Sequence, residues 1–261
     1  MDEMLRKELL RSELKEKNKG KRIIPCKYRP KYPDSAEREY MRLVNAYMAI
    51  EKEVLMKYMP DIKQILNEGT QLRADSKKDN EQKRRTARFS ALDNTIVRLT
   101  ILFKTIQREL DAAFGLYDLK RQINIIANLD HKLTVKEWKK AVSKTLGINL
   151  LDDYYSGEYY AKMLEKWVSD NVDLIKTVPN QSLDRMKELV YENYMKGTTT
   201  TNIVKEIQRQ YGMSKRHAKL IARDQTAKLN ADITESQQRD AGVPKYEWSG
   251  VMDRRERKSH R

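Results

Sequence analysis

The sequence of 261 residues contains few of the residues on which several classes of protein depend. Nine glycines are too few for an α/β nucleotide-binding enzyme of this length, because phosphate loops and tight βα turns use many of them. Cys26 is the single cysteine, which excludes a disulfide-stabilised secreted domain and indicates a reducing compartment of synthesis. No apolar run approaches the roughly 20 residues of a membrane-spanning helix, and the charged N-terminus lacks the apolar segment of a secretory signal. We therefore expect no membrane partner.

Catalytic signatures are also missing. The sequence has no glycine-rich phosphate-binding motif, no GxSxG nucleophile motif and no HExxH zinc motif. Its histidines, His131, His217 and His260, are far apart, and none lies at metal-ligand spacing from Cys26. That cysteine lies in a proline-rich segment, which is a poor platform for a nucleophile that must be held in place. We predict a protein without catalytic residues, bound metal or cofactor.

Positive charge is what the sequence has in excess. It contains 53 lysines and arginines against 38 aspartates and glutamates, a net charge of +15 with histidine neutral. Charged residues make up 35% and hydrophobic residues 39%, a balance that fits elongated helical proteins with large solvated faces. The excess favours a polyanionic neighbour, either nucleic acid or an acidic protein surface, although lysine-rich helix faces are also common without one.

Residues 1–33 have the composition of a basic N-terminal arm followed by a proline-rich connector. Eleven lysines and arginines and five acidic residues fall within residues 1–31. Pro25, Pro30 and Pro33 interrupt any regular element. The segment CKYRPKYP therefore predicts an extended chain, which is either a plain linker or a segment that crosses a partner surface.

The most regular pattern in the chain is a heptad seam over residues 89–117. Its apolar residues alternate spacings of three and four: Phe89, Leu92, Ile96, Leu99, Phe103, Ile106, Leu110, Ala113 and Tyr117. This pattern predicts one helix over about 79–127. The seam needs a partner. The segment 35–68 would cover it in an antiparallel hairpin, and self-association through the 89–117 seam is the alternative.

The other helices of an elongated region over 34–150 are predicted from their start and stop signals. The first begins at Asp34 or Ser35, is bent or interrupted at Pro60 and stops near Gly69. A shorter helix covers 134–146, with Thr134 as its N-cap, Glu137 as the capping-box partner and Gly147 as its stop.

Residues 151–261 predict a compact, α-rich C-terminal domain. Helices are expected over 158–176 and 180–196, with Pro179 between them. After the break at Gly197 one helix ends at Tyr211-Gly212, and a longer one is closed by Gly242. The tyrosines of LLDDYYSGEYY suit internal packing or a protein interface, and packing is favoured. KYEWSGV is the one strand-like segment, so the predicted fold class is mainly α, an elongated helical hairpin or bundle followed by an α-rich domain with a minor β element.

Two basic segments are candidates for nucleic-acid binding, because clustered lysines and arginines neutralise phosphates. One lies before the seam and the other would form a stripe on one face of the last long helix, where an ordinary solvated face is the alternative. The candidate residues are Lys77, Lys78, Lys83, Arg84, Arg85, Arg88, Lys215, Arg216 and Lys219.

The C-terminal segment VMDRRERKSHR forms a polar cluster in the sequence. Asp253 and Arg257 are four residues apart and can pair across one helical turn or a tight loop, and His260 could join them. Spacing alone leaves three alternatives open, which are a structural network, a polyanion contact and a fragment of a nuclease-like site.

From about Asn171 onward the chain resembles the phage head morphogenesis family, the minor head proteins similar to protein F of phage Mu. The resemblance lies in NVDLIKTVPNQSLDRMKELV, in KGTTTTNIVKEIQRQYGMSKRHAKLIARDQT, in AGVPKYEWSG and in VMDRRERKSHR, which occur in the family's order. The residues that match the family motif are Ala222, Arg223, Trp248, Asp253, Arg257 and His260. The chain departs from the family at Asp224-Gln225, where Thr-Glu is usual. Family members also continue beyond this ending, so we expect the C-terminal domain to be truncated.

The resemblance implies a structural protein of a tailed-phage head. We expect it to be made in the host cytoplasm and to lie inside the capsid near the portal vertex, with the portal protein, the major capsid protein and packaged double-stranded DNA as partners. The alternative functions are a DNA-binding protein without sequence specificity and, with less support, a nuclease-like fragment.

Overall fold

The structure is a computed structural model that describes residues 8, 11–16, 25–75, 81–147, 149–150, 155 and 157–243, without the side chains of residues 73, 75 and 81–93. Long helices dominate it: α2 (Asp34–Asp75), α3 (Glu81–Gly115), α4 (Leu119–Leu146), α5 (Glu158–Met195) and α6 (Thr200–Asp240). The described residues contain no strand, and the strand predicted in KYEWSGV lies outside them. The predicted mainly α fold class is confirmed.

The chain forms two compact units, each assembled from segments that are distant in sequence. Unit 1 comprises residues 1–32, 131–162 and 229–261, and unit 2 comprises residues 33–130 and 163–228. Helices α4, α5 and α6 each contribute residues to both units.

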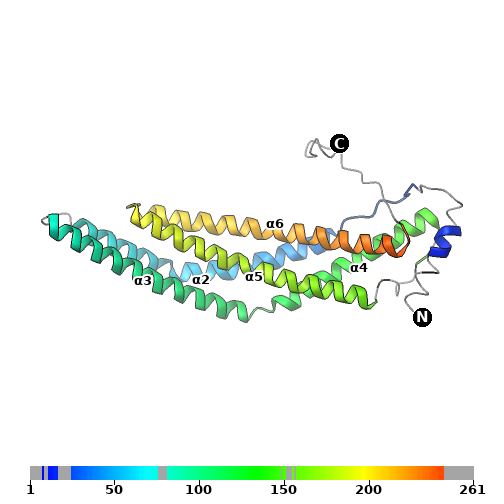
Figure 1. The fold of residues 1–261 in the computed structure, drawn as a ribbon, viewed down its shortest axis with the longest axis horizontal. Helices are drawn as coiled ribbons and strands as arrows, with labels where there is room; N and C mark the ends of the chain where they lie inside the picture. Colours follow the sequence, from blue (N-terminus) through cyan, green and yellow to red (C-terminus); the bar gives the residue numbers. More distant parts are fainter. Residues whose placement is uncertain are drawn as a thin grey trace. The chain divides into compact units, whose positions relative to one another are not determined.

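Unit 2 is held together by one apolar core that contains the heptad seam. Helices α2 and α3 lie side by side as the predicted hairpin (Figure 1). The seam residues Leu99, Phe103, Ile106 and Leu110 are buried against Leu55, Ile62 and Leu66 of α2. Residues of α5 and α6 belong to the same core: Leu183, Met186, Val190, Tyr194, Ile203, Val204 and Ile207. The part of the seam whose side chains are described is therefore covered within the chain itself.

The predicted helix boundary at Pro179 and the alternative that Pro60 interrupts its helix are both wrong, because packing carries each helix past a residue that favours a break. Pro60 lies within α2 and Pro179 within α5. Proline removes one backbone hydrogen bond, but Met59 and Ile62 on either side of Pro60 are buried in the core. Val178 and Pro179 are themselves buried.

Two glycines predicted to end helices also lie inside them. Gly69 is within α2, where a methyl group would collide with the Tyr194 hydroxyl and the Thr95 hydroxyl. The Tyr194 hydroxyl donates to Thr95 Oγ1 at 3.1 Å, so the missing side chain makes room for a buried contact among α2, α3 and α5. Gly212 lies within α6, and open space surrounds the position of its absent Cβ.

The single helix predicted over 79–127 is instead divided between α3 and α4. Residues 116–118 form a turn after Gly115, and Asp118 caps α4 by accepting a hydrogen bond from the Arg121 amide at 3.2 Å. Because α4 already begins at Leu119, the separate helix predicted from Thr134 is also wrong. Thr134 lies in the middle of α4, and its hydroxyl donates to Asn230 Oδ1 at 3.0 Å within unit 1.

Glycine closes three helices as predicted. Gly147, Gly197 and Gly242 have φ values of 72°, 79° and 73°, in the left-handed region that favours glycine. The favoured packing role holds for two of the tyrosines in unit 1, because Tyr155 and Tyr160 are buried edge to face with ring centroids 5.9 Å apart. Tyr159 is 49% exposed, and Tyr154 lies outside the described residues.

Replacing Gly69 by Ala should destabilise the protein by about 1–3 kcal/mol, because the added methyl group overpacks the contact with Thr95 and Tyr194. Gly212→Ala is the matched control, since it adds the same group in open space in the middle of a helix. That change should stabilise the protein by up to about 1 kcal/mol through helix propensity. Urea unfolding followed by circular dichroism measures both, and a Gly69→Ala variant as stable as Gly212→Ala would contradict the packing account.

Candidate nucleic-acid interface

The predicted basic stripe forms on α6. Lys215, Arg216, Lys219 and Arg223 lie on one side of the helix because of their spacing. Arg216 and Arg223 are exposed, whereas Lys215 and Lys219 are half-buried. None of the four forms an ion pair with a described residue. The α6 stripe, as we call these four residues, is therefore available to an anionic partner.

Three other basic residues of α6, Arg209, Lys228 and Arg239, form ion pairs with neighbouring acids. Arg209 pairs with Glu206 at 2.6 Å, and Lys228 pairs with Asp224 at 2.8 Å. Asp224 is the acid that departs from the family pattern, and in this chain it is exposed and serves that ion pair. The α6 stripe thus gathers on one side of the helix four basic residues that form no ion pair with a described residue, and Lys205 is the one such residue of α6 outside it.

The opposite side of this helical segment explains the small residues of the family motif. Ala218, Ile221 and Ala222 are buried, with Ala222 fully so. The Trp167 indole of α5 donates to the Gln225 carbonyl at 3.2 Å. Its ring packs edge-on against the ring of Tyr40 of α2, with ring centroids 5.8 Å apart. Alanine allows the helices to approach closely here, and this packing fixes the direction in which Arg223 points to solvent.

An open hollow lies beside the α6 stripe. Its lining is His217, Leu220, Ile221, Arg223, Asp224 and Ala227. Leu220 is 63% exposed, so an apolar side chain borders the basic side of the helix. The hollow therefore combines one histidine, one arginine and one carboxylate with apolar side chains.

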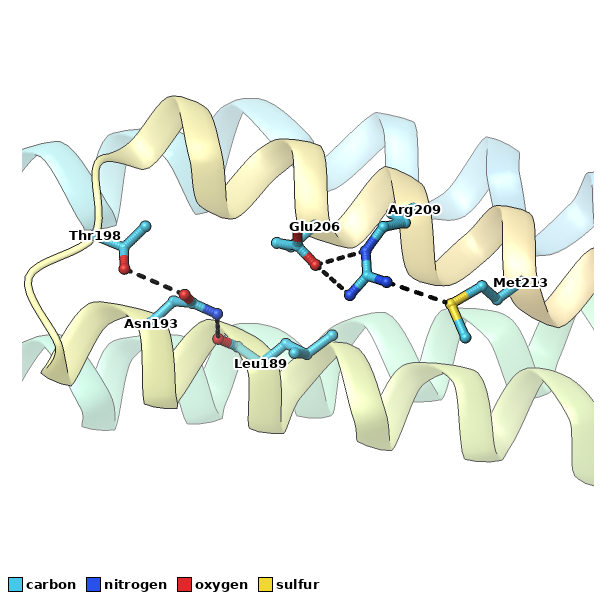
Figure 2. Close-up of polar contacts among 6 residues, drawn as sticks. All are labelled: Leu189, Asn193, Thr198, Glu206, Arg209 and Met213. Carbon is cyan, nitrogen blue, oxygen red and sulfur yellow. Dashed lines mark hydrogen bonds and ion pairs between the residues drawn. The ribbon is translucent and has the colours of Figure 1, made fainter.

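The turn between α5 and α6 sets the start of the helix that carries the stripe. Asn193 donates from its amide to the Leu189 carbonyl at 2.8 Å and accepts from the Thr198 hydroxyl at 3.2 Å (Figure 2). The Thr198 amide also donates to the Asn193 carbonyl at 2.9 Å. Arg209, one turn before Met213, is held by Glu206 in the same view (Figure 2). These bonds fix the hairpin that positions the α6 stripe.

The structure describes no side chain for the remaining predicted site residues. Lys77 and Lys78 lie outside the described residues, and Lys83, Arg84, Arg85 and Arg88 lie on the α3 backbone without described side chains. Trp248, Asp253, Arg257 and His260 also lie outside the described residues. The structure therefore brings together only Lys215, Arg216, Lys219, Ala222 and Arg223 of the predicted set.

Sequence reasoning missed a buried acid, Glu51 of α2. Its side chain is fully buried in unit 2, and neither carboxyl oxygen accepts a hydrogen bond from a described residue. Burial raises the pKa of Glu51 from 4.5 to about 8, partly offset by the nearby Ser182 hydroxyl. The helical spacing of Tyr47, Glu51 and Val54 was the available signal, because it puts the acid on the apolar side of α2.

The described part of the chain contains neither a recognisable metal site nor a membrane-spanning helix. No group of three or more histidine, cysteine or acidic side chains there could hold a metal ion. Among the helices that the structure describes, none combines the length and apolar character needed to cross a bilayer.

Comparisons with known proteins find similarity in the C-terminal part of the chain. Residues 184–261 match the family described as phage Mu protein F like protein. A curated protein of Haemophilus influenzae, described as an uncharacterized protein, is 34% identical over 90 residues, which cover 34% of this chain and 20% of that protein. The chain thus matches about a fifth of the length of this relative. No solved structure matches the chain.

Replacing Glu51 by Gln should remove a pH dependence of stability. Between pH 4.5 and 8 the unfolded chain has released a proton that folded Glu51 retains, so the free energy of unfolding falls as pH rises through this window. The largest slope from this group is about 1.4 kcal/mol per pH unit, and Glu51→Gln should lose it. Thermal unfolding from acid to mildly alkaline pH measures the slope. Glu53→Gln, which alters an exposed carboxylate of the same helix, should keep it, and an unchanged slope in Glu51→Gln would contradict the assignment.

Proposed function

We propose that this chain, whose residues 184–261 belong to the phage Mu protein F-like family, is a minor capsid protein that acts in head morphogenesis of a tailed phage. In this role it would bridge the portal or the inner capsid surface and the packaged DNA. Its place would be the virion, inside the capsid near the portal vertex. The match over residues 184–261 is the observation that carries the proposal.

The described structure supports a role in holding macromolecules together. The matched segment begins in α5 and includes all of α6, so it contains the hairpin on which the α6 stripe lies. Long helices packed on one core give a rigid support for a binding face. Partner proteins would include the portal protein and the major capsid protein, and the polyanion would be double-stranded DNA.

The α6 stripe is the proposed DNA contact within the family-matched segment. Four basic residues without ion pairs to described residues can neutralise phosphates and release condensed counterions. Such contacts carry no sequence information, which suits a protein that meets packaged DNA of any sequence.

A DNA-binding protein that needs no capsid partner is the second candidate. The net charge of +15 and the α6 stripe favour it as well, because both act through phosphates alone. The two functions differ in their protein partners. A nuclease-like activity would depend on Asp253, Arg257 and His260, which lie outside the described residues.

Capture of head proteins tests the proposed function. The full chain, immobilised through a tag, should retain the portal protein or the major capsid protein encoded by the same phage. An unrelated basic protein of similar net charge is the control for capture by charge alone. Capture of neither head protein, together with tight DNA binding, would favour the second candidate and contradict the first.

Neutralising the α6 stripe should weaken DNA binding. The triple variant Lys215→Gln/Arg216→Gln/Lys219→Gln should lower the slope of log affinity against log salt by about 2–3, because each phosphate contact contributes about 0.9. Fluorescence anisotropy with a labelled duplex measures the slope.

A control triple, Lys52→Gln/Lys63→Gln/Lys104→Gln, removes three positive charges from exposed lysines of α2 and α3. It should leave most of the slope. An equal loss in both triples would show that the α6 stripe makes no specific phosphate contact.

A further inference from the structure

We infer that a second basic surface, formed in unit 1 by residues 25–32 and the α4 segment 131–146, binds the phosphate backbone of double-stranded DNA. We call it the α4–connector surface. The inference rests on the proposed function for the identity of the polyanion, and it adds a binding face outside the family-matched residues 184–261.

The charge on this surface is almost entirely of one sign. Residues 25–32 and 131–146 contain eight lysines and arginines and one acidic residue, Glu137. The basic residues are Lys27, Arg29, Lys31, Lys132, Lys136, Lys139, Lys140 and Lys144. The lysines of α4 are not among the nucleic-acid-binding residues predicted from the sequence.

The single acid is consumed by internal contacts. Glu137 is buried and accepts hydrogen bonds from the Tyr28 hydroxyl at 2.5 Å and the Lys31 amide at 3.1 Å. Lys140 Nζ pairs with its other oxygen at 2.7 Å. Burial alone would raise the pKa of Glu137, but these hydrogen bonds lower it to about 2. The carboxylate stays ionised while facing the connector, so residues 25–32 and 131–146 present no negative side chain to solvent.

The same contacts hold the connector against α4. The Lys27 amide donates to Thr145 Oγ1 at 3.1 Å, and Lys144 Nζ lies 4.7 Å from the centre of the Tyr28 ring. Residues 25–32 therefore pack along the helix, so this segment is not a plain linker. As a result Lys27, Arg29 and Lys31, all exposed, lie beside the α4 lysines and extend their surface.

The α4 lysines form a regular row. Lys132, Lys136, Lys140 and Lys144 recur every four residues, which puts them on one face of the helix. The row extends over roughly 18 Å at about 1.5 Å per residue. Successive phosphates of one DNA strand are about 3.4 Å apart along the duplex axis, so several phosphates come within reach of the row at once.

The absence of apolar groups favours DNA over an acidic protein. No large hydrophobic side chain is exposed in residues 25–32 or in the described residues between 131 and 147. Protein interfaces are depleted in lysine and have an apolar or aromatic centre, whereas DNA interfaces are polar and much more positive. The α6 stripe differs here, because Leu220 lies next to it and is exposed.

The test is the triple variant Lys132→Gln/Lys136→Gln/Lys144→Gln in the full chain. It spares Lys140, which pairs with Glu137, so the connector keeps its hydrogen bonds to Glu137 and Thr145 and loses only the contact between Lys144 and the Tyr28 ring. Binding to a labelled duplex of about 30 base pairs, measured between about 50 and about 200 mM salt, should show a log–log slope lower by about 2–3. Affinity near the middle of this range should fall about tenfold. Circular dichroism and thermal unfolding establish that the variant is folded.

Two controls separate specific contact from net charge and from structural damage. The triple Lys52→Gln/Lys63→Gln/Lys104→Gln removes the same charge elsewhere and should retain most of the slope. The triple Lys132→Arg/Lys136→Arg/Lys144→Arg keeps the charge and should bind DNA as the unchanged chain does. Equal losses in the two glutamine triples, or no loss in either, would overturn the inference.

A competitor identifies the partner class. Polyglutamate should displace the duplex only weakly. If the α4 triple left DNA binding intact but abolished binding of polyglutamate, the surface would be a site for an acidic protein and the DNA inference would fail. Capture of head proteins is measured separately: its failure contradicts the proposed function, and the salt slope alone decides the α4–connector surface.

Discussion

The burial of the α3 seam is the interaction on which the rest of unit 2 depends. One side of α3 is an apolar strip formed by Leu99, Phe103, Ile106 and Leu110. Its exposure to water would be unfavourable, so the strip must be covered by other helices. Helix α2 covers part of it, and residues from α5 and α6 complete the cover. The sharing of one core by four helices explains why helices run through Pro60 and Pro179. Each proline forfeits one backbone hydrogen bond, while the packing of its neighbours in the core favours the continuous helix.

Helical content and the α2–α3 hairpin were predictable because both follow from local spacing. The ends of helices were less so. Gly69 and Gly197 are both glycines that the sequence predicts at the end of a helix. Gly197 does end α5, in the left-handed conformation, whereas Gly69 continues α2. The difference is the proximity of Thr95 and Tyr194, residues distant from Gly69 in sequence. A single sequence does not contain that contact, so a glycine needed for close approach looks like a glycine that stops a helix.

The candidate surfaces show the same limit. The α6 stripe followed from spacing within one helix. The α4 lysines have an equally clear spacing, but the sequence predicts a helix start at Thr134 and therefore a capping role for Glu137. Its partners are Tyr28 and Lys31, more than a hundred residues earlier in the chain. The basic surface on α4 becomes evident only when the fold shows that its one acid faces inward.

In unit 1, Arg11 binds the C-terminal end of α6. Its guanidinium donates to the carbonyls of Asp240 at 3.3 Å and Arg239 at 3.5 Å. The Arg239 carbonyl also accepts from the Gly242 amide at 3.0 Å, and a cation at this end of α6 complements the helix dipole. The residues joined by this contact are 229 positions apart in sequence. During synthesis the earliest part of unit 1 leaves the ribosome long before α6 exists. Assembly of this unit must therefore wait for nearly all of residues 1–243 to be translated, whereas the basic connector can dock on α4 as soon as residues 131–146 have been translated.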